Sequence, residues 1–185
     1  MLISNISKLF KYKWGGEFFS KLKPTQNEIM VPDGVKKSIK AGTGLMLIYI
    51  CISALVTILT TVLITSAFGY LRGYGGFGLN VGIIISALIT LLISAAIIIT
   101  LMVYLTGNKK RKPMPYFIVL ILAGIGIFFM IWGIISAIAM IGYTAIFGLI
   151  SLIGVLVEFV ALCSIAVGCI DFCLAANSAE PQKTE

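Results

Sequence analysis

The chain has 185 residues, of which 59% are hydrophobic and only 11% are charged, and this composition lies outside the range of soluble globular domains. Its net charge of +7 would suit nucleic acid, but nearly all the lysines lie before Gly44 or in the run 109–112, beside hydrophobic segments. That placement is typical of the cytosolic side of a membrane, so we expect the partner to be anionic inner-leaflet lipid of the bilayer and not nucleic acid.

Catalytic and metal-binding chemistry is poorly represented in the sequence. Histidine is absent, which excludes imidazole metal sites and histidine-based catalysis. The four cysteines all lie in hydrophobic segments, where we interpret them as small packing residues: Cys51, Cys163, Cys169 and Cys173. We therefore expect no enzyme activity, no cofactor and no metal site.

Residues 1–43 are predicted to form a basic region on the cytosolic face. Apolar residues recur there at helical spacing: Leu2, Ile3, Ile6, Leu9, Phe10 and Trp14. Lysines lie between them: Lys8, Lys11 and Lys13. This pattern predicts an amphipathic helix lying on the inner leaflet with its lysines at headgroup level, and a partly disordered basic tail is the alternative.

The first two predicted spans, 44–68 and 81–105, each carry hydroxyl side chains at steps of four. The stripes are Ser53, Thr57 and Thr61 on the first span, and Ser86, Thr90 and Ser94 on the second. Positions four apart lie on one helical face, and in lipid such a face turns towards protein. The stripes therefore predict that the two helices pack on each other, with a narrow polar path between them as the alternative.

The third and fourth predicted spans, 116–141 and 145–176, are joined by a turn so short that they must form an antiparallel hairpin. Both contain small residues at helical spacing, which allow the backbones of neighbouring helices to approach closely. We expect five of them to line the contact between these two helices: Gly126, Gly133, Gly154, Ala161 and Gly168.

One carboxyl group, Glu158, lies near the middle of the fourth span on its small-residue face. An ionisable group at that depth costs a few kcal/mol, so it rarely occurs there by accident. It could load a proton or cation, as in a small transporter or channel. It could instead be a neutral hydrogen-bonding group between helices, which we favour because no lysine, arginine or histidine lies deep in the other spans.

The distribution of basic residues predicts that both termini are cytosolic. Thirteen basic residues then lie inside, among them the run Lys109, Lys110, Arg111 and Lys112, and only Arg72 lies outside. The expected fold is an all-α integral membrane protein, a bundle of four transmembrane helices in the cell membrane, with residues 177–185 as a cytosolic tail. The expected function is that of a non-enzymatic subunit or scaffold, which assembles with itself or within a larger membrane complex through small-residue faces.

Overall fold

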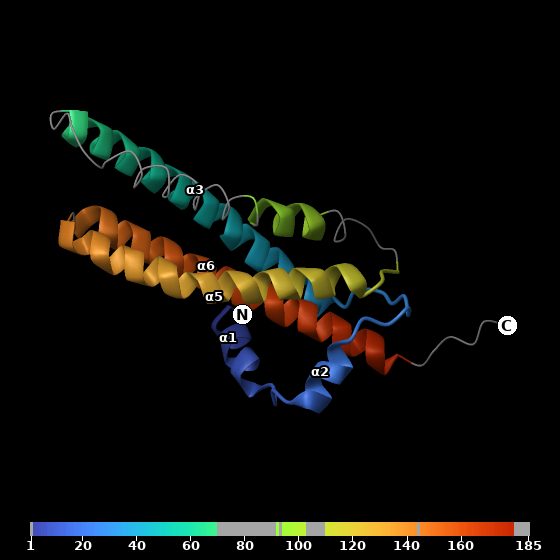
Figure 1. The fold of residues 1–185 in the computed structure, drawn as a ribbon. Coiled ribbons are helices and arrows are strands. Elements are labelled where there is room, and N and C mark those ends of the chain that lie inside the picture. The colour runs from blue at the N-terminus through green and yellow to red at the C-terminus, as the bar shows by residue number, and fades with distance from the viewer. Residues whose placement is uncertain (1, 70–91, 93, 103–109, 144, 180–185) are drawn as a thin grey trace.

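The computed structural model describes residues 2–69, 92, 94–102, 110–143 and 145–179, and the regular secondary structure in this part of the chain is helical apart from one isolated β-bridge. The helices are α1 (Leu2–Lys11), α2 (Gly16–Leu22), α3 (Asp33–Gly69), α5 (Met114–Tyr143) and α6 (Ala145–Ser178), and residues 94–102 are helical as well. The prediction of an all-helical fold is therefore confirmed for the described residues. Figure 1 shows the long helices running side by side, with α1 and α2 lying against them near the end where α6 terminates.

Three helices in the described part of the chain are long and apolar enough to cross a membrane. The stretches are Asp33–Leu59, Met114–Ile135 and Gly148–Ser178. No proline interrupts α3 or α6, and Pro115 lies in the first turn of α5, where its missing N–H costs nothing. The 34 residues of α6 span about 51 Å at 1.5 Å per residue, which exceeds the roughly 30 Å hydrocarbon core.

The predicted first span is part of a longer helix. The hydropathy pattern starts it at Gly44, whereas α3 begins at Asp33, so the predicted boundary between residues 43 and 44 lies inside one continuous helix. The additional turns carry Lys36, Lys37 and Lys40. These charged side chains lower the mean hydropathy, so a hydropathy pattern does not detect this part of the helix. These turns pack against α6 through Ile39, which is completely buried.

The central element of the bundle is α6, which packs against α3, α5, α1 and α2. Every residue from 161 to 170 is buried, although most membrane helices keep one face towards lipid. Near its end, Phe172 lies against Tyr116 of α5 with ring centroids 4.2 Å apart. The core of the molecule therefore surrounds the second half of α6.

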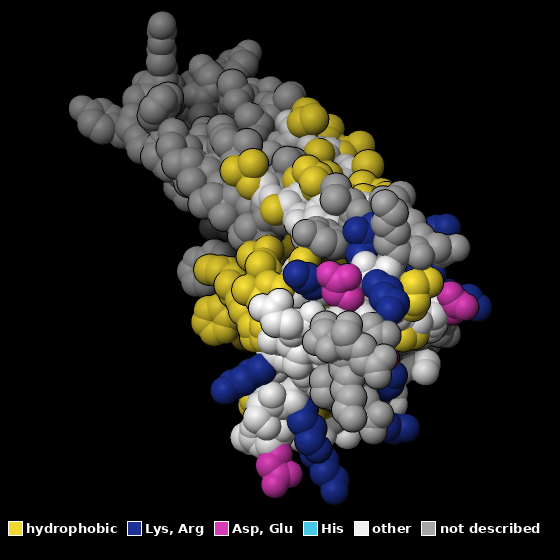
Figure 2. All heavy atoms as spheres, turned by 90° about the vertical axis from the view of Figure 1, so that its right-hand side faces the viewer, with side chains coloured by type: hydrophobic (Ala, Val, Ile, Leu, Met, Phe, Trp, Pro, Cys, Tyr) yellow, Lys and Arg dark blue, Asp and Glu magenta, His cyan; other side chains and the backbone are white. Residues whose placement is uncertain are grey.

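The outer surface of the long helices is apolar. Large exposed side chains include Ile48, Leu55 and Ile58 on α3, Ile121, Phe128, Phe129 and Ile135 on α5, and Ile146, Leu149, Ile153 and Leu156 on α6. Charged side chains gather instead at the end of the bundle that faces the viewer in Figure 2. An apolar flank with a charged end is what a helix bundle in lipid requires.

The connection between α5 and α6 is as tight as the sequence implies. The two helices are separated by one residue and run antiparallel side by side (Figure 1). A Cβ atom at Gly148 would lie 2.6 Å from the Cα atom of Ile141, closer than real Cβ contacts. Glycine is therefore needed at this position to let the chain turn back on itself.

Candidate functional site

Glu158 lies at the contact between α6 and α3. Its side chain is only 8% exposed, and the phenol of Tyr49 is its hydrogen-bonding neighbour. The hydroxyl of Ser53, one turn further along α3, contacts the Tyr49 oxygen in turn. Three polar side chains from two helices thus meet within the apolar part of the bundle.

The small-residue face of α6 packs mainly on α3, which differs from the prediction that it packs on α5. A Cβ at Gly154 would meet Ile52, and a Cβ at Gly168 would meet Ile39, both on α3. At Ala161 the two backbones approach closely, because its carbonyl oxygen would lie 2.9 Å from a Cβ placed at Gly42. Gly42 was missed by the sequence reading because it lies just before the predicted start of the first span.

The predicted glycines of α5 do face α6. A Cβ at Gly126 would lie 3.0 Å from Leu162, and one at Gly133 would lie 3.4 Å from Val155. The five predicted packing residues are therefore divided between two contacts. This division follows from the central position of α6, which presents different faces to α3 and α5.

The hydroxyl stripe of α3 has a different role at each described position. Ser53 contacts Tyr49, whereas the Thr57 hydroxyl donates a hydrogen bond to the carbonyl of Ser53, 2.8 Å away in its own helix. Ser94, on the predicted second span, is buried. Ser86, Thr90 and the side chain of Thr61 lie outside the described residues. The mutual packing of the two stripes therefore stays a prediction.

The cysteines of α6 are core residues. Cys163, Cys169 and Cys173 are completely buried, and Cys51 is exposed on the outer face of α3. Within the described ranges, no three cysteine, aspartate or glutamate side chains gather closely enough to hold a metal ion.

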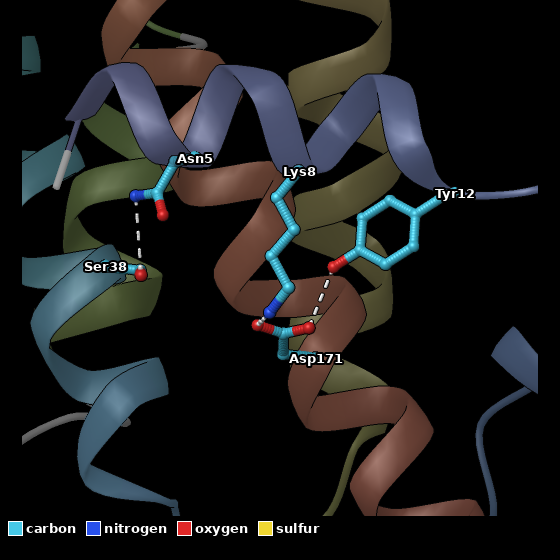
Figure 3. Close-up of polar contacts among 5 residues, drawn as sticks. All are labelled: Asn5, Lys8, Tyr12, Ser38 and Asp171. Atoms are coloured by element: carbon cyan, nitrogen blue, oxygen red, sulfur yellow. Dashed lines mark hydrogen bonds and ion pairs between the residues drawn. The ribbon is translucent and has the colours of Figure 1, made fainter.

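A second polar cluster joins the N-terminal segment to α6 around Asp171 (Figure 3). One carboxylate oxygen of Asp171 accepts a hydrogen bond from Lys8 Nζ at 2.5 Å, and the other accepts one from the Tyr12 hydroxyl at 2.8 Å. On the same face of α1, Asn5 donates a hydrogen bond to Ser38 of α3 at 3.4 Å. Burial, and secondly the hydrogen bond to Asp171, raise the pKa of Tyr12 above its ordinary value.

This cluster changes the interpretation of Lys8. The sequence pattern assigns Lys8, Lys11 and Lys13 together to lipid headgroups, but Lys8 points at the bundle and pairs with Asp171. The ion pair neutralises an acid on α6 that lies seven residues before the end of the helix. Of these three lysines, Lys8 is the one that takes part in an ion pair within the described residues.

We call residues 2–31 the N-terminal arm, and it also covers the end of α6. The amide of Asn27 donates to the carbonyls of Ala176 and Ala179, at 3.5 and 3.4 Å. Asn177 donates in return to the carbonyls of Lys21 and Lys23. Side-chain amides thus satisfy carbonyl groups that a helix end leaves without intrahelical partners.

The basic loop before α5 lies against the same arm. Ile29 and Arg111 form an antiparallel bridge, with N–O distances of 3.2 and 2.8 Å, and Lys112 lies 3.8 Å from Glu28. Lys110 is exposed, and Lys109 lies outside the described residues. The headgroup role expected for this loop stays a prediction.

The fold and its two polar clusters define an all-helical protein with, in the part of the chain described, three helices suited to crossing a membrane. Comparison with models of protein families, with curated proteins and with solved structures finds no match to this chain.

Proposed function

We propose that the chain is a non-enzymatic, four-span protein of the cell membrane that acts as a subunit or scaffold in a membrane assembly, as a homo-oligomer or within a larger complex. The observation that carries this proposal is the pairing of Glu158 with Tyr49 at the contact between α6 and α3. A carboxyl group that bonds a phenol on the facing helix holds two helices together, which is a structural task.

The path of the chain supports a fourth span. Gly69 ends α3 at one end of the bundle, and Met114 begins α5 at the other end (Figure 1). The chain between these two helices contains the predicted span 81–105. Residues 94–102 are helical, with Ile97 and Leu101 in the core.

The positions of the charged segments support an orientation with both termini in the cytosol. The N-terminal arm, the loop 110–112 and the end of α6 meet at one end of the bundle through the contacts described above. The sequence assigns eight basic residues to the segment before Gly44 and four to the loop 109–112. Such a concentration of positive charge at one end is typical of the cytosolic side.

The outer faces of α3 and α5 support assembly as well as lipid contact. They expose large apolar side chains along most of their length, including Phe128 and Phe129. The small residues of α6 are already used inside the molecule. A partner span would therefore pack on these larger side chains, in place of the glycine faces that the sequence suggested.

The alternative is a small proton- or cation-coupled transporter or channel that works through Glu158. The proximity of Tyr49 and Ser53 favours it, because these hydroxyl groups add polar partners around the carboxyl group. The two functions differ in whether Glu158 must titrate during the working cycle, and this difference can be tested directly.

The test compares Glu158→Gln, Glu158→Leu and Tyr49→Phe in liposomes that hold a proton gradient. If Glu158 is a structural group, the glutamine variant keeps wild-type stability, because an amide retains the oxygen that accepts from Tyr49. The leucine and phenylalanine variants should each lose about 0.5–1.5 kcal/mol, the net value of a hydrogen bond.

Proton flux decides between the two functions. We expect the wild-type protein to leave the gradient intact. A wild-type protein that dissipates the gradient, together with a silent but stably folded Glu158→Gln variant, would refute the structural role and establish the transporter.

A further inference from the structure

We propose that the elbow of the N-terminal arm, residues 10–23, is a binding surface for anionic lipid headgroups in the leaflet that surrounds the bundle. This inference rests on the proposed membrane setting and deepens it, because it names the part of the chain that binds the lipid and the class of lipid that it binds.

The first argument is the orientation of α1. The contacts of α1 with the bundle are largely polar, although Leu9 also packs against the core. Asn5, Lys8 and Tyr12 contact Ser38 and Asp171 of the bundle (Figure 3). Phe10, by contrast, is 75% exposed. This arrangement suits a helix that is held to the protein by polar contacts and presents Phe10 to lipid.

The second argument is an aromatic cluster at the elbow. Trp14 stacks edge-on against Phe18 at 5.2 Å between ring centroids, and it lies 6.0 Å from Phe19. Trp14 remains 51% exposed and Phe19 56% exposed. Exposed aromatic side chains gathered at one point are costly in water, whereas the boundary between headgroups and acyl chains is where tryptophan is enriched.

The third argument is charge. The elbow contains four lysines and one glutamate, a net charge of +3: Lys11, Lys13, Lys21 and Lys23, with Glu17. All four lysines are exposed, and none takes part in an ion pair within the described residues. Lysines around exposed aromatic side chains complement a negatively charged membrane surface.

The fourth argument is position. In Figure 1 the turn between α1 and α2 is the part of the arm farthest from the long helices, and it lies beside the last turns of α6, not beyond them. Asp171, which fixes the arm, is 13 residues after Glu158, or about 20 Å along the helix. With Glu158 in the hydrocarbon core, the elbow lies at the depth of the headgroups.

The test uses the full-length protein in vesicles, with Trp132→Phe as background so that Trp14 is the only tryptophan. Quenching of Trp14 by lipids brominated close to the headgroup is measured in phosphatidylcholine and in mixtures with phosphatidylserine. We expect quenching to increase with the phosphatidylserine fraction and to decrease with salt.

The paired variants are Lys11→Gln with Lys13→Gln, and the matched control is Lys37→Gln with Lys40→Gln on α3. Each elbow lysine removed should reduce the ratio of bound to free elbow about fivefold, as expected for one basic residue at an anionic surface. The control pair should leave that ratio unchanged.

Trp14 quenching that is equal with and without phosphatidylserine, or unaffected by the elbow lysines, would overturn the proposal. So would an inserted protein whose Trp14 is unquenched in every vesicle, because its elbow would then lie in water. A protein that alkaline carbonate extracts from the vesicles would refute both this proposal and the membrane setting. If the protein resists carbonate extraction but Trp14 quenching does not depend on phosphatidylserine, the elbow proposal is refuted and the membrane setting is not.

Discussion

Replacing Gly42 by alanine should weaken the contact between α3 and α6. The new Cβ would lie 2.7 Å from Ile165 Cγ1, 2.9 Å from the Ala161 carbonyl oxygen and 3.0 Å from the Ile165 nitrogen. Two of these three atoms belong to the backbone of α6, so the clash cannot be relieved by a side-chain rotation. The helices must separate, and overpacking of this kind costs about 1–3 kcal/mol.

Gly44, two residues further along the same helix, provides the matched control. A Cβ at Gly44 would meet no atom within 4 Å, and the residue is exposed. Gly44→Ala should therefore gain up to about 1 kcal/mol from the higher helix propensity of alanine. The two variants should differ by about 1–4 kcal/mol in the free energy of unfolding.

The assay is equilibrium unfolding in mixed micelles, in which sodium dodecyl sulfate is added to dodecyl maltoside while helicity or tryptophan emission is followed. The midpoint for Gly42→Ala should fall below that of the wild type, and the midpoint for Gly44→Ala should not. Equal midpoints for the two variants would show that α3 and α6 do not approach each other at Gly42, and the account of the small-residue face would then be wrong.

Two further predictions concern the attachment of the arm. Because the docked state raises the pKa of Tyr12, docking should be at full strength below about pH 10, the ordinary tyrosine value, and should weaken as the pH rises above it. The absorbance difference between wild type and Tyr12→Phe, recorded through this range, should show that the Tyr12 phenol ionises above the ordinary tyrosine pKa. In Asp171→Asn this ionisation should move to lower pH. An ionisation that this substitution leaves unchanged would contradict the hydrogen bond. A double-mutant cycle of Lys8→Met and Asp171→Asn should give a coupling of no more than about 1 kcal/mol, because both side chains are partly exposed, and a coupling of several kcal/mol would show that the pair is more deeply buried than described.

Hydropathy predicted much of the fold because a helix that crosses lipid must consist mostly of apolar residues. The predicted spans 116–141 and 145–176 agree closely with α5 (Met114–Tyr143) and α6 (Ala145–Ser178). The start of α3 was predicted eleven residues too late, because hydropathy detects only the part of a helix that is apolar. A helix that continues past the apolar region with lysines on its surface gives no such signal.

The candidate site was predictable in part. The spacing of Gly154, Ala161 and Gly168 correctly placed Glu158 on the small-residue face, since helical geometry alone fixes which residues share a face. It could not show which helix packs on that face, because small residues allow close approach by any neighbour. Tyr49, the neighbour of Glu158, lies one helical turn before Ser53, the first residue of the hydroxyl stripe on the first span.

The role of Lys8 could not have been predicted from sequence. Asp171 is 163 positions away, and only the folded arm brings the two side chains together. The local sequence pattern predicts the same headgroup role for Lys8, Lys11 and Lys13. The tertiary structure distinguishes Lys8, because it pairs with Asp171.

The central position of α6 has a consequence for how the molecule is made. Every element that packs on α6 is synthesised before it, and about a hundred residues separate the end of α3 from Asp171. At typical rates of translation, α3 is therefore complete for on the order of ten seconds before its main partner emerges from the ribosome. During this interval the arm has no Asp171 to bind, and the glycines of α3 and α5 have no helix to receive them. The early helices are thus available to bind an insertion factor or chaperone, and a chain truncated before residue 145 would keep these helices but lose the element that joins them.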